Sequence, residues 1–162
     1  MRIALSRIDN RLLHGVVATQ WAPHTGAQRI MVVDDETAGN EIAKSSMRLA
    51  RPAGTAISII ALETALENFR ANKYAGQSIF IIAREPGTLR ALVEGAGVPI
   101  KEVDVGATAQ REAGGDVVEV NRRVTLDALE RSDLRYLADH GARVYAQYLL
   151  SEKPQPLDDL LS

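Results

Sequence analysis

The stretch "RIMVVDD", residues 29–35, decides the fold class of this chain. Its apolar residues follow one another without polar alternation and stop at two aspartates. Such a run is typical of a parallel β-strand that is covered on both faces. The apolar run "SIFIIA", residues 78–83, predicts another strand. Together these runs indicate a parallel sheet that lies between two layers of helices.

Outward from these two strands, strand and helix patterns alternate along the whole chain. The 162 residues suit one domain, 1–162, and the alternation predicts an α/β fold with a mostly parallel sheet. A turn at 114–115 precedes one further strand within 111–127, and the proline-containing tail after residue 151 is expected on the surface or on a partner. The remaining expected strands are 2–8, 55–61, 101–105 and 142–150, and the expected helices are 15–22, 40–50 (with Ile42, Ser46 and Leu49 along one side), 63–73, 86–94 and 128–140.

Composition excludes several classes of function. The net charge of −2 and the 4% of aromatic residues do not favour nucleic-acid binding. There is no cysteine, which excludes disulfides and thiolate chemistry and fits a reducing cytoplasm. No apolar run approaches the roughly 20 residues of a membrane span, and "MRIALSRID" is too charged for a signal peptide.

The chemistry of the chain is concentrated in "RIDNRLLHGVV", residues 7–17. In open α/β sheets, ligands bind at the carboxyl ends of the strands, and His14 follows the first expected strand. Arg7 and Arg11 flank this histidine, and guanidinium groups pair well with phosphate or carboxylate. Asp9 could orient a nitrogen of the ring or pair with an arginine, and Gly15 is expected to free the backbone for a tight turn. A neutral imidazole is a competent nucleophile, so this set of residues could carry a phosphoryl group.

Outside this segment, one arginine is expected to contribute to the site, and the other two histidines are not. Arg84 ends another strand at the same edge of the sheet and is expected to help bind phosphate. His24 and His140 lie near the ends of expected helices and read as structural or surface residues. The three histidines share no metal-ligand spacing, so neither a metal nor a cofactor is expected, and nucleotide-binding fingerprints are absent.

Three segments carry a resemblance to a known family. "SRIDNRLLHGVVATQW" resembles the active-site segment of the IIB components of the mannose/fructose/sorbose class of the sugar phosphotransferase system (PTS). "VVDDETAGNEIAKSSMRLARPAGT" and "VTLDALERSDLRYLADHGARVYAQ" are similar to later parts of the same family. The resemblance covers nearly the whole chain. It implies a twisted, mostly parallel sheet with one antiparallel strand and helices on both faces.

The resemblance also implies a function. A phosphohistidine of a IIA protein would donate a phosphoryl group to Nδ1 of His14. The group would then pass to a sugar bound by the membrane components IIC and IID, at the inner face of the membrane. Arg11 would stabilise the phosphoryl charge, with charge-stabilising and orienting roles for Arg7 and Asp9. The resemblance leaves open which sugar is used and whether the chain forms a homodimer.

Some positions depart from the family pattern. Val16 stands where relatives commonly have glutamine, and Glu85 where they often have a small polar residue. We expect Glu85 to pair with Arg84, because an unpaired carboxylate near a phosphoryl group is costly.

Two other classes of function share part of this pattern. A histidine phosphatase or mutase would need arginine directly before the histidine, where this chain has Leu13. The main alternative is a non-catalytic or regulatory α/β binding module.

Overall fold

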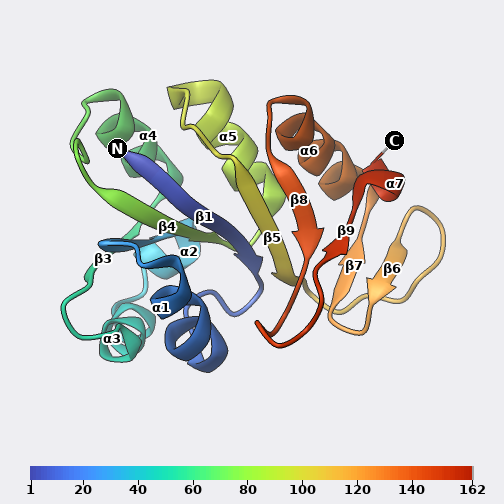
Figure 1. The fold of residues 1–162 in the computed structure, drawn as a ribbon, viewed down its shortest axis with the longest axis horizontal. Coiled ribbons are helices and arrows are strands. Elements are labelled where there is room, and N and C mark those ends of the chain that lie inside the picture. The colour runs from blue at the N-terminus through green and yellow to red at the C-terminus, as the bar shows by residue number, and fades with distance from the viewer. Residues whose placement is uncertain (162) are drawn as a thin grey trace.

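A computed structural model describes residues 1–161, and within this range seven strands form one twisted sheet (Figure 1). The strand order is β3-β2-β4-β1-β5-β8-β9; every pairing is parallel except that of β9 with β8. The strands are β1 (Arg2–Asp9), β2 (Arg29–Val33), β3 (Ala56–Ile60), β4 (Ser78–Ala83), β5 (Glu102–Ala107), β8 (Arg143–Ala146) and β9 (Gln155–Pro156). The predicted fold class, a mostly parallel sheet with one antiparallel strand, is therefore confirmed.

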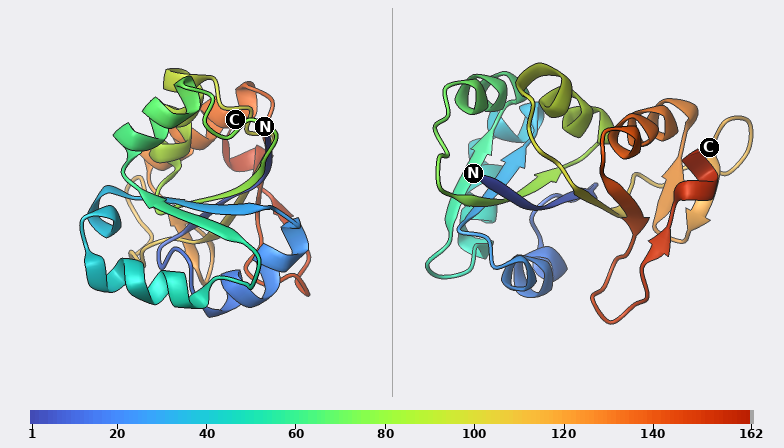
Figure 2. Two further views of the ribbon diagram at one scale, coloured as in Figure 1. Left: turned by 90° about the vertical axis from the view of Figure 1, so that its left-hand side faces the viewer. Right: turned by 45° about the horizontal axis from the view of Figure 1, so that its top comes forward.

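Helices cover both faces of the sheet, as predicted (Figure 2). Strand β4 shows why: Phe80 and Ile82 point into the core on one face, and Ile79 and Ile81 into the core on the other. The first face is covered by the π-helical segment η1 (Val17–Trp21), α1 (Ala22–Thr25) and α3 (Glu41–Ala50), and the second by α4 (Leu62–Arg70), α5 (Pro86–Ala96) and α6 (Ala128–Asp139). The remaining helices of the described chain, α2 (Asp35–Ala38) and α7 (Asp158–Leu161), are short.

The C-terminal third differs from the prediction. The strand expected over 142–150 ends at Ala146, and the chain then turns back to form β9. The tail was expected on the surface or on a partner, but Leu157 and Leu161 are buried in the core beside α6. Segment 111–127 forms a separate hairpin, β6 (Val118–Asn121) and β7 (Val124–Leu126), so the antiparallel strand of the main sheet is β9.

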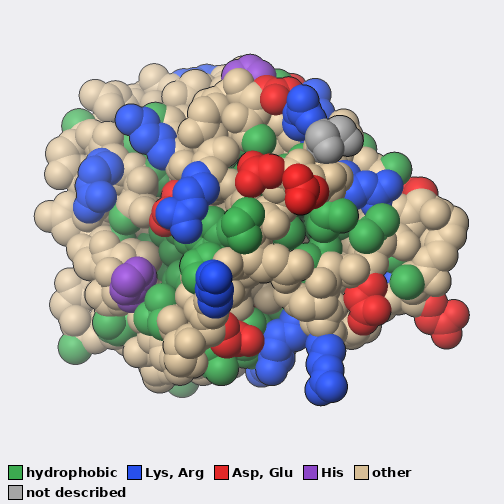
Figure 3. All heavy atoms as spheres, turned by 45° about the vertical axis from the view of Figure 1, so that its right-hand side comes forward, with side chains coloured by type: hydrophobic (Ala, Val, Ile, Leu, Met, Phe, Trp, Pro, Cys, Tyr) green, Lys and Arg blue, Asp and Glu red, His purple; other side chains and the backbone are tan. Residues whose placement is uncertain are grey.

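The apolar side predicted for residues 40–50 is also not the side that α3 buries. Ile42 and Leu49 are 83% and 88% exposed, whereas Met47 and Ala50 pack toward the sheet. Acidic and basic side chains lie among one another on the face seen in Figure 3, in keeping with the small net charge. Nowhere in residues 1–161 is a helix both long and apolar enough to span a membrane.

The topology places the carboxyl end of β1 at a crevice. Strand β1 lies between β4 and β5, and Asp9, its last residue, pairs with Ala107 at the end of β5. The chain leaves β1 toward the face covered by η1, but it leaves β4 toward the face covered by α5. Loops that diverge in this way open a space at the strand ends, which is where ligands bind in such sheets.

Candidate functional site

The loop after β1 makes a tight turn at Leu12. This residue has a left-handed backbone (φ 58°), its side chain is fully buried, and its N–H donates to the carbonyl of Asp9 at 3.1 Å. The tight turn was expected at Gly15, but Gly15 already has helical geometry. A Cβ added at Gly15 would meet no atom within 4 Å, so this glycine leaves open space beside His14.

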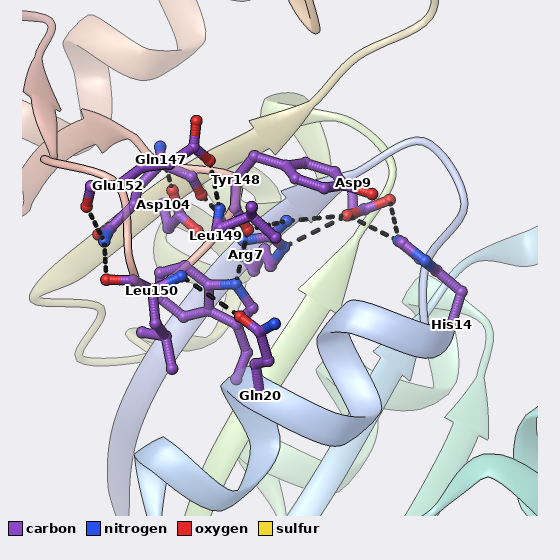
Figure 4. A network of polar contacts seen from close by, with 11 residues as sticks. Arg7, Asp9, His14, Gln20, Asp104, Gln147, Tyr148, Leu149, Leu150 and Glu152 are labelled. Carbon is purple, nitrogen blue, oxygen red and sulfur yellow. Dashed lines mark hydrogen bonds and ion pairs between the residues drawn. The ribbon is translucent and has the colours of Figure 1, made fainter.

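His14 is held by Asp9, as the sequence predicts. Its Nε2 lies 3.1 Å from both carboxylate oxygens of Asp9, and the side chain is only 10% exposed (Figure 4). A carboxylate only accepts hydrogen bonds, so Nε2 carries a proton and donates it. In the neutral ring the lone pair then lies on Nδ1, for which no partner occurs among residues 1–161. The ring is thus oriented with Nδ1 as its free nucleophilic atom.

Arg7 lies behind Asp9 in the protein interior. Its Nε and one Nη donate to Asp9 Oδ2 at 3.3 and 3.2 Å, while the other Nη donates to Asp104 Oδ2. The side chains of all three residues are 0% exposed. The resemblance implies a charge-stabilising role for Arg7. Its guanidinium is buried and fully engaged, so it contacts the site through Asp9 (Figure 4).

The space for Arg7 exists because residue 106 is glycine. A Cβ at Gly106 would lie 2.2 Å from the Arg7 Cζ, a contact that no side chain could make. The guanidinium therefore packs on the bare backbone of β5. Any larger residue at position 106 would displace Arg7 from Asp9.

One arginine serves two buried carboxylates, and their pKa values diverge. Burial would raise the pKa of Asp9, but the hydrogen bond from His14 and the charge of Arg7 outweigh it and hold this pKa below its usual value. Asp104 has fewer partners: besides Arg7, its Oδ1 accepts from the Gln147 N–H at 2.9 Å. Burial therefore dominates there and raises the pKa of Asp104 to about 7.

The loop after β8 closes the site from the other side. The carbonyl of Tyr148 accepts from Trp21 Nε1 at 2.8 Å and from Arg7 at 3.4 Å, and the carbonyl of Gln147 accepts from Arg7 at 3.1 Å. Trp21 ends η1, and its ring centroid lies 4.8 Å from the Arg7 Cζ. These bonds use the carbonyls that a continuing strand would have paired, which explains why β8 ends early.

A hollow of about 160 Å³ opens in front of His14. Asp9 and Arg11 line it from the first loop, and the Arg11 N–H donates to Asp9 Oδ1 at 2.9 Å. The Arg11 side chain has no hydrogen-bond or ion-pair partner in the part of the chain that the structure describes, so its guanidinium is free to bind an anion. The remaining lining residues are Asn10, Ala107, Thr108, Gln110, Arg123 and Tyr148.

Arg84 lies at the same edge but outside this hollow. It pairs with Asp34 at 3.4 Å and donates to the carbonyl of Asn10 at 2.6 Å. The expected pairing of Arg84 with Glu85 is therefore wrong: Asp34, which caps α2, takes that place, and Glu85 is exposed. Arg84 and Glu85 line a neighbouring groove of about 430 Å³. Through its hydrogen bond to the Asn10 carbonyl, Arg84 supports the loop after β1.

The other two histidines lie elsewhere. His140 stacks on Tyr136 with 3.9 Å between ring centroids, and its Nδ1 donates to the carbonyl of Tyr136. His24 contacts Trp21 edge-on at the end of the first helical segment. Neither histidine lines the hollow that contains His14.

Sequence reasoning missed Asp104, Tyr148 and Arg123. For Asp104 a signal existed: an aspartate and a glycine interrupt the apolar strand "VDVGA" at 103–107, and a glycine inside a strand often marks a close approach. No comparable local signal marks Tyr148 or Arg123, because only the folding of distant segments brings them to His14.

Comparison with known proteins places this geometry in a family. The family model described as "PTS system sorbose subfamily IIB component" matches residues 3–162. The chain is 34% identical over 158 residues to the N-acetylgalactosamine-specific phosphotransferase enzyme IIB component 1 of Escherichia coli K12, covering 97% of each protein. It is 32% identical over its whole length to the PTS system mannose-specific EIIAB component of the same strain, of which it spans only 49%.

The fold is also that of solved relatives. The IIBSor domain of the sorbose permease from Klebsiella pneumoniae superimposes with a TM-score of 0.87 at 28% identity, covering 98% of this chain and 95% of that domain. The crystal structure of the Escherichia coli N-acetylgalactosamine-specific IIB component 1 gives a TM-score of 0.84 at 33% identity, covering 95% and 98%.

Proposed function

Because the chain belongs to the sorbose subfamily of IIB components of the sugar phosphotransferase system, we propose that it carries a phosphoryl group on Nδ1 of His14. Members of this family are phosphoryl-transfer components of a sugar PTS. In the proposed relay a phosphohistidine of a IIA protein is the donor, and a sugar held by IIC and IID is the acceptor. The chain would work in the cytoplasm at the inner face of the membrane.

The observation that carries this proposal is the orientation of the His14 ring. Both Asp9 oxygens lie 3.1 Å from Nε2, so the lone pair of Nδ1 faces away from Asp9. This lone pair attacks phosphorus while the bond from phosphorus to the donor nitrogen breaks, and the electron pair returns to the donor. Phosphorylation places positive charge on the imidazole ring, and the Asp9 carboxylate stabilises that charge.

The second transfer reverses the role of His14. A hydroxyl oxygen of the sugar attacks phosphorus, the bond to Nδ1 breaks with its electron pair returning to Nδ1, and the hydroxyl proton passes to solvent water. Arg11 has an exposed guanidinium that no side chain or carbonyl within residues 1–161 binds, and it would bind the phosphoryl oxygens in both steps. Arg7 keeps Asp9 ionised and fixed, so it is a positioning residue.

Phosphorylation from phosphoenolpyruvate tests the proposal. The chain is incubated with phosphoenolpyruvate, the general PTS proteins and a IIA protein, and the bound phosphate is measured. We expect one acid-labile, alkali-stable phosphate, which is lost in His14→Ala and retained in His24→Ala and His140→Ala. Stable labelling of His14→Ala would refute the assignment, and no labelling of the wild type would favour the regulatory binding module.

A further inference from the structure

The hairpin β6–β7 brings a second free arginine to the hollow of His14. Arg123 lies in its turn, where its N–H donates to Asn121 Oδ1 at 2.8 Å. Its carbonyl accepts from the N–H of Thr108, directly after β5, at 2.9 Å. Thr108 and Thr125 exchange two more bonds, of 2.8 and 2.9 Å. The hairpin is thus fastened to the strand end that forms one wall of the hollow.

The side chain of Arg123 is held without being neutralised. Its Cζ lies 3.6 Å from the ring centroid of Tyr148, which also lines the hollow. Stacking on an aromatic face leaves the N–H edge of a guanidinium free for an anion. Within residues 1–161 no carboxylate pairs with Arg123, in contrast to Arg84 and Arg111 on the neighbouring groove.

The charges around His14 favour such a group. Behind the ring, the single charge of Arg7 is already taken up by Asp9, with Asp104 bonded to the same guanidinium. A dianionic phosphoryl group on Nδ1 would add negative charge beside Asp9, and Arg11 supplies only one positive charge from the first loop. The hollow of about 160 Å³ has the volume of about five waters, enough for a phosphoryl group between the walls.

We propose that Arg123 is a catalytic residue that binds the phosphoryl group on His14, together with Arg11. The assignment rests on the proposed phosphoryl transfer. The side chain reaches the group from the hairpin, and Tyr148 fixes its plane. An acidic surface of a partner protein is the other ligand that a free arginine could take, and the experiment below separates the two.

The test compares Arg123→Gln, Arg123→Lys and the matched control Arg122→Gln with the wild type. Arg122 is the exposed neighbour in the same turn and does not line the hollow. With saturating phospho-IIA, we expect Arg123→Gln to slow phosphorylation of His14 about ten- to a hundredfold. Arg123→Lys should recover part of the loss, and Arg122→Gln should stay within about twofold of the wild type, at unchanged melting temperatures.

Two outcomes would overturn the proposal. One is a wild-type rate for Arg123→Gln while the wild type itself is labelled. The other is that Arg123→Gln and Arg122→Gln change only the KM for phospho-IIA, and by the same factor. That result would assign both arginines to docking of the partner protein.

A titration with inorganic phosphate, followed by the NMR signals of the arginine Nε–H groups, separates this proposal from the relay. If the wild type takes no label, the relay fails. Phosphate binding that is weakened in Arg123→Gln but not in Arg122→Gln would still support the anion site. Phosphate binding that is unchanged in Arg123→Gln would refute it.

Discussion

Ionisation of Asp104 should make the stability of this protein fall as the pH rises. The ordinary pKa of the group is 3.8, and burial raises it to about 7 in the folded state. The folded state therefore holds the proton over a pH range where the unfolded state has lost it. The resulting stabilisation is complete below about pH 4 and is lost as the pH rises through about 7.

The two pKa values set the size of the effect. For a single group with these values, the free energy of unfolding falls by about 2 to 3 kcal/mol between about pH 5 and pH 8. Urea denaturation across this pH range measures the free energy of unfolding. The Asp104→Asn side chain cannot ionise, so this variant should lack the fall assigned to Asp104, even if its stability at any single pH differs from that of the wild type.

A second carboxylate on the same strand provides the control. Glu102 has a side chain that is 38% exposed on β5, so Glu102→Gln should keep the wild-type slope. Burial also raises the pKa of Asp133, with the same sign, but that contribution persists in both variants and cancels. A wild-type stability that is constant over this range, or a fall in Asp104→Asn as large as that of the wild type, would refute the assignment of the proton to Asp104.

Two further substitutions test the first loop and its neighbour. Under the proposed role of Arg11, Arg11→Gln should slow transfer to the sugar about a hundredfold, or ~3 kcal/mol. The melting temperature should change little, because the exposed guanidinium has no partner within residues 1–161 to lose, and Arg11→Lys should recover part of the rate. An Arg11→Gln protein that transfers at the native rate would show that Arg11 is only a surface charge. Glu85→Ser should leave the rate of His14 phosphorylation within about twofold, since Glu85 lines the neighbouring groove and not the hollow. A large gain in rate would mean that this carboxylate repels the phosphoryl group.

Local patterns in the sequence predicted most of the sheet. The strands at "RIMVVDD" and "SIFIIA" could be predicted without long-range information. Because they are buried on both faces, nearly all of their residues are apolar. The C-terminal strand was overextended because residues 142–150 have strand-like composition. Its end is decided by Arg7 and Trp21, which bind the carbonyls at 147 and 148.

The site was predictable where its residues are neighbours in sequence. The orientation of His14 by Asp9 is a contact across five positions, and the segment 7–15 contains both partners. The burial of Arg7 could not be predicted, because its second carboxylate, Asp104, lies 97 positions away. Likewise the partner of Arg84 is not adjacent Glu85 but Asp34, 50 positions away, since both stand at the carboxyl ends of neighbouring strands.

The ties of Arg7 to Asp104 and to the loop after β8 also set an order of assembly. During synthesis, a chain leaves the ribosome from its N-terminus, and early segments can fold before later ones exist. Here the first loop emerges with Arg7, Asp9 and His14, but the carbonyl of Tyr148 that helps hold Arg7 comes 141 positions later. In a nascent chain that ends before this loop, Arg7 lacks its carbonyl partners at 147 and 148. Asp9, which orients His14, is then held less firmly. The surroundings of His14 are therefore completed only after residue 148 has been made, and a segment synthesised long before it is among the last to reach its final geometry.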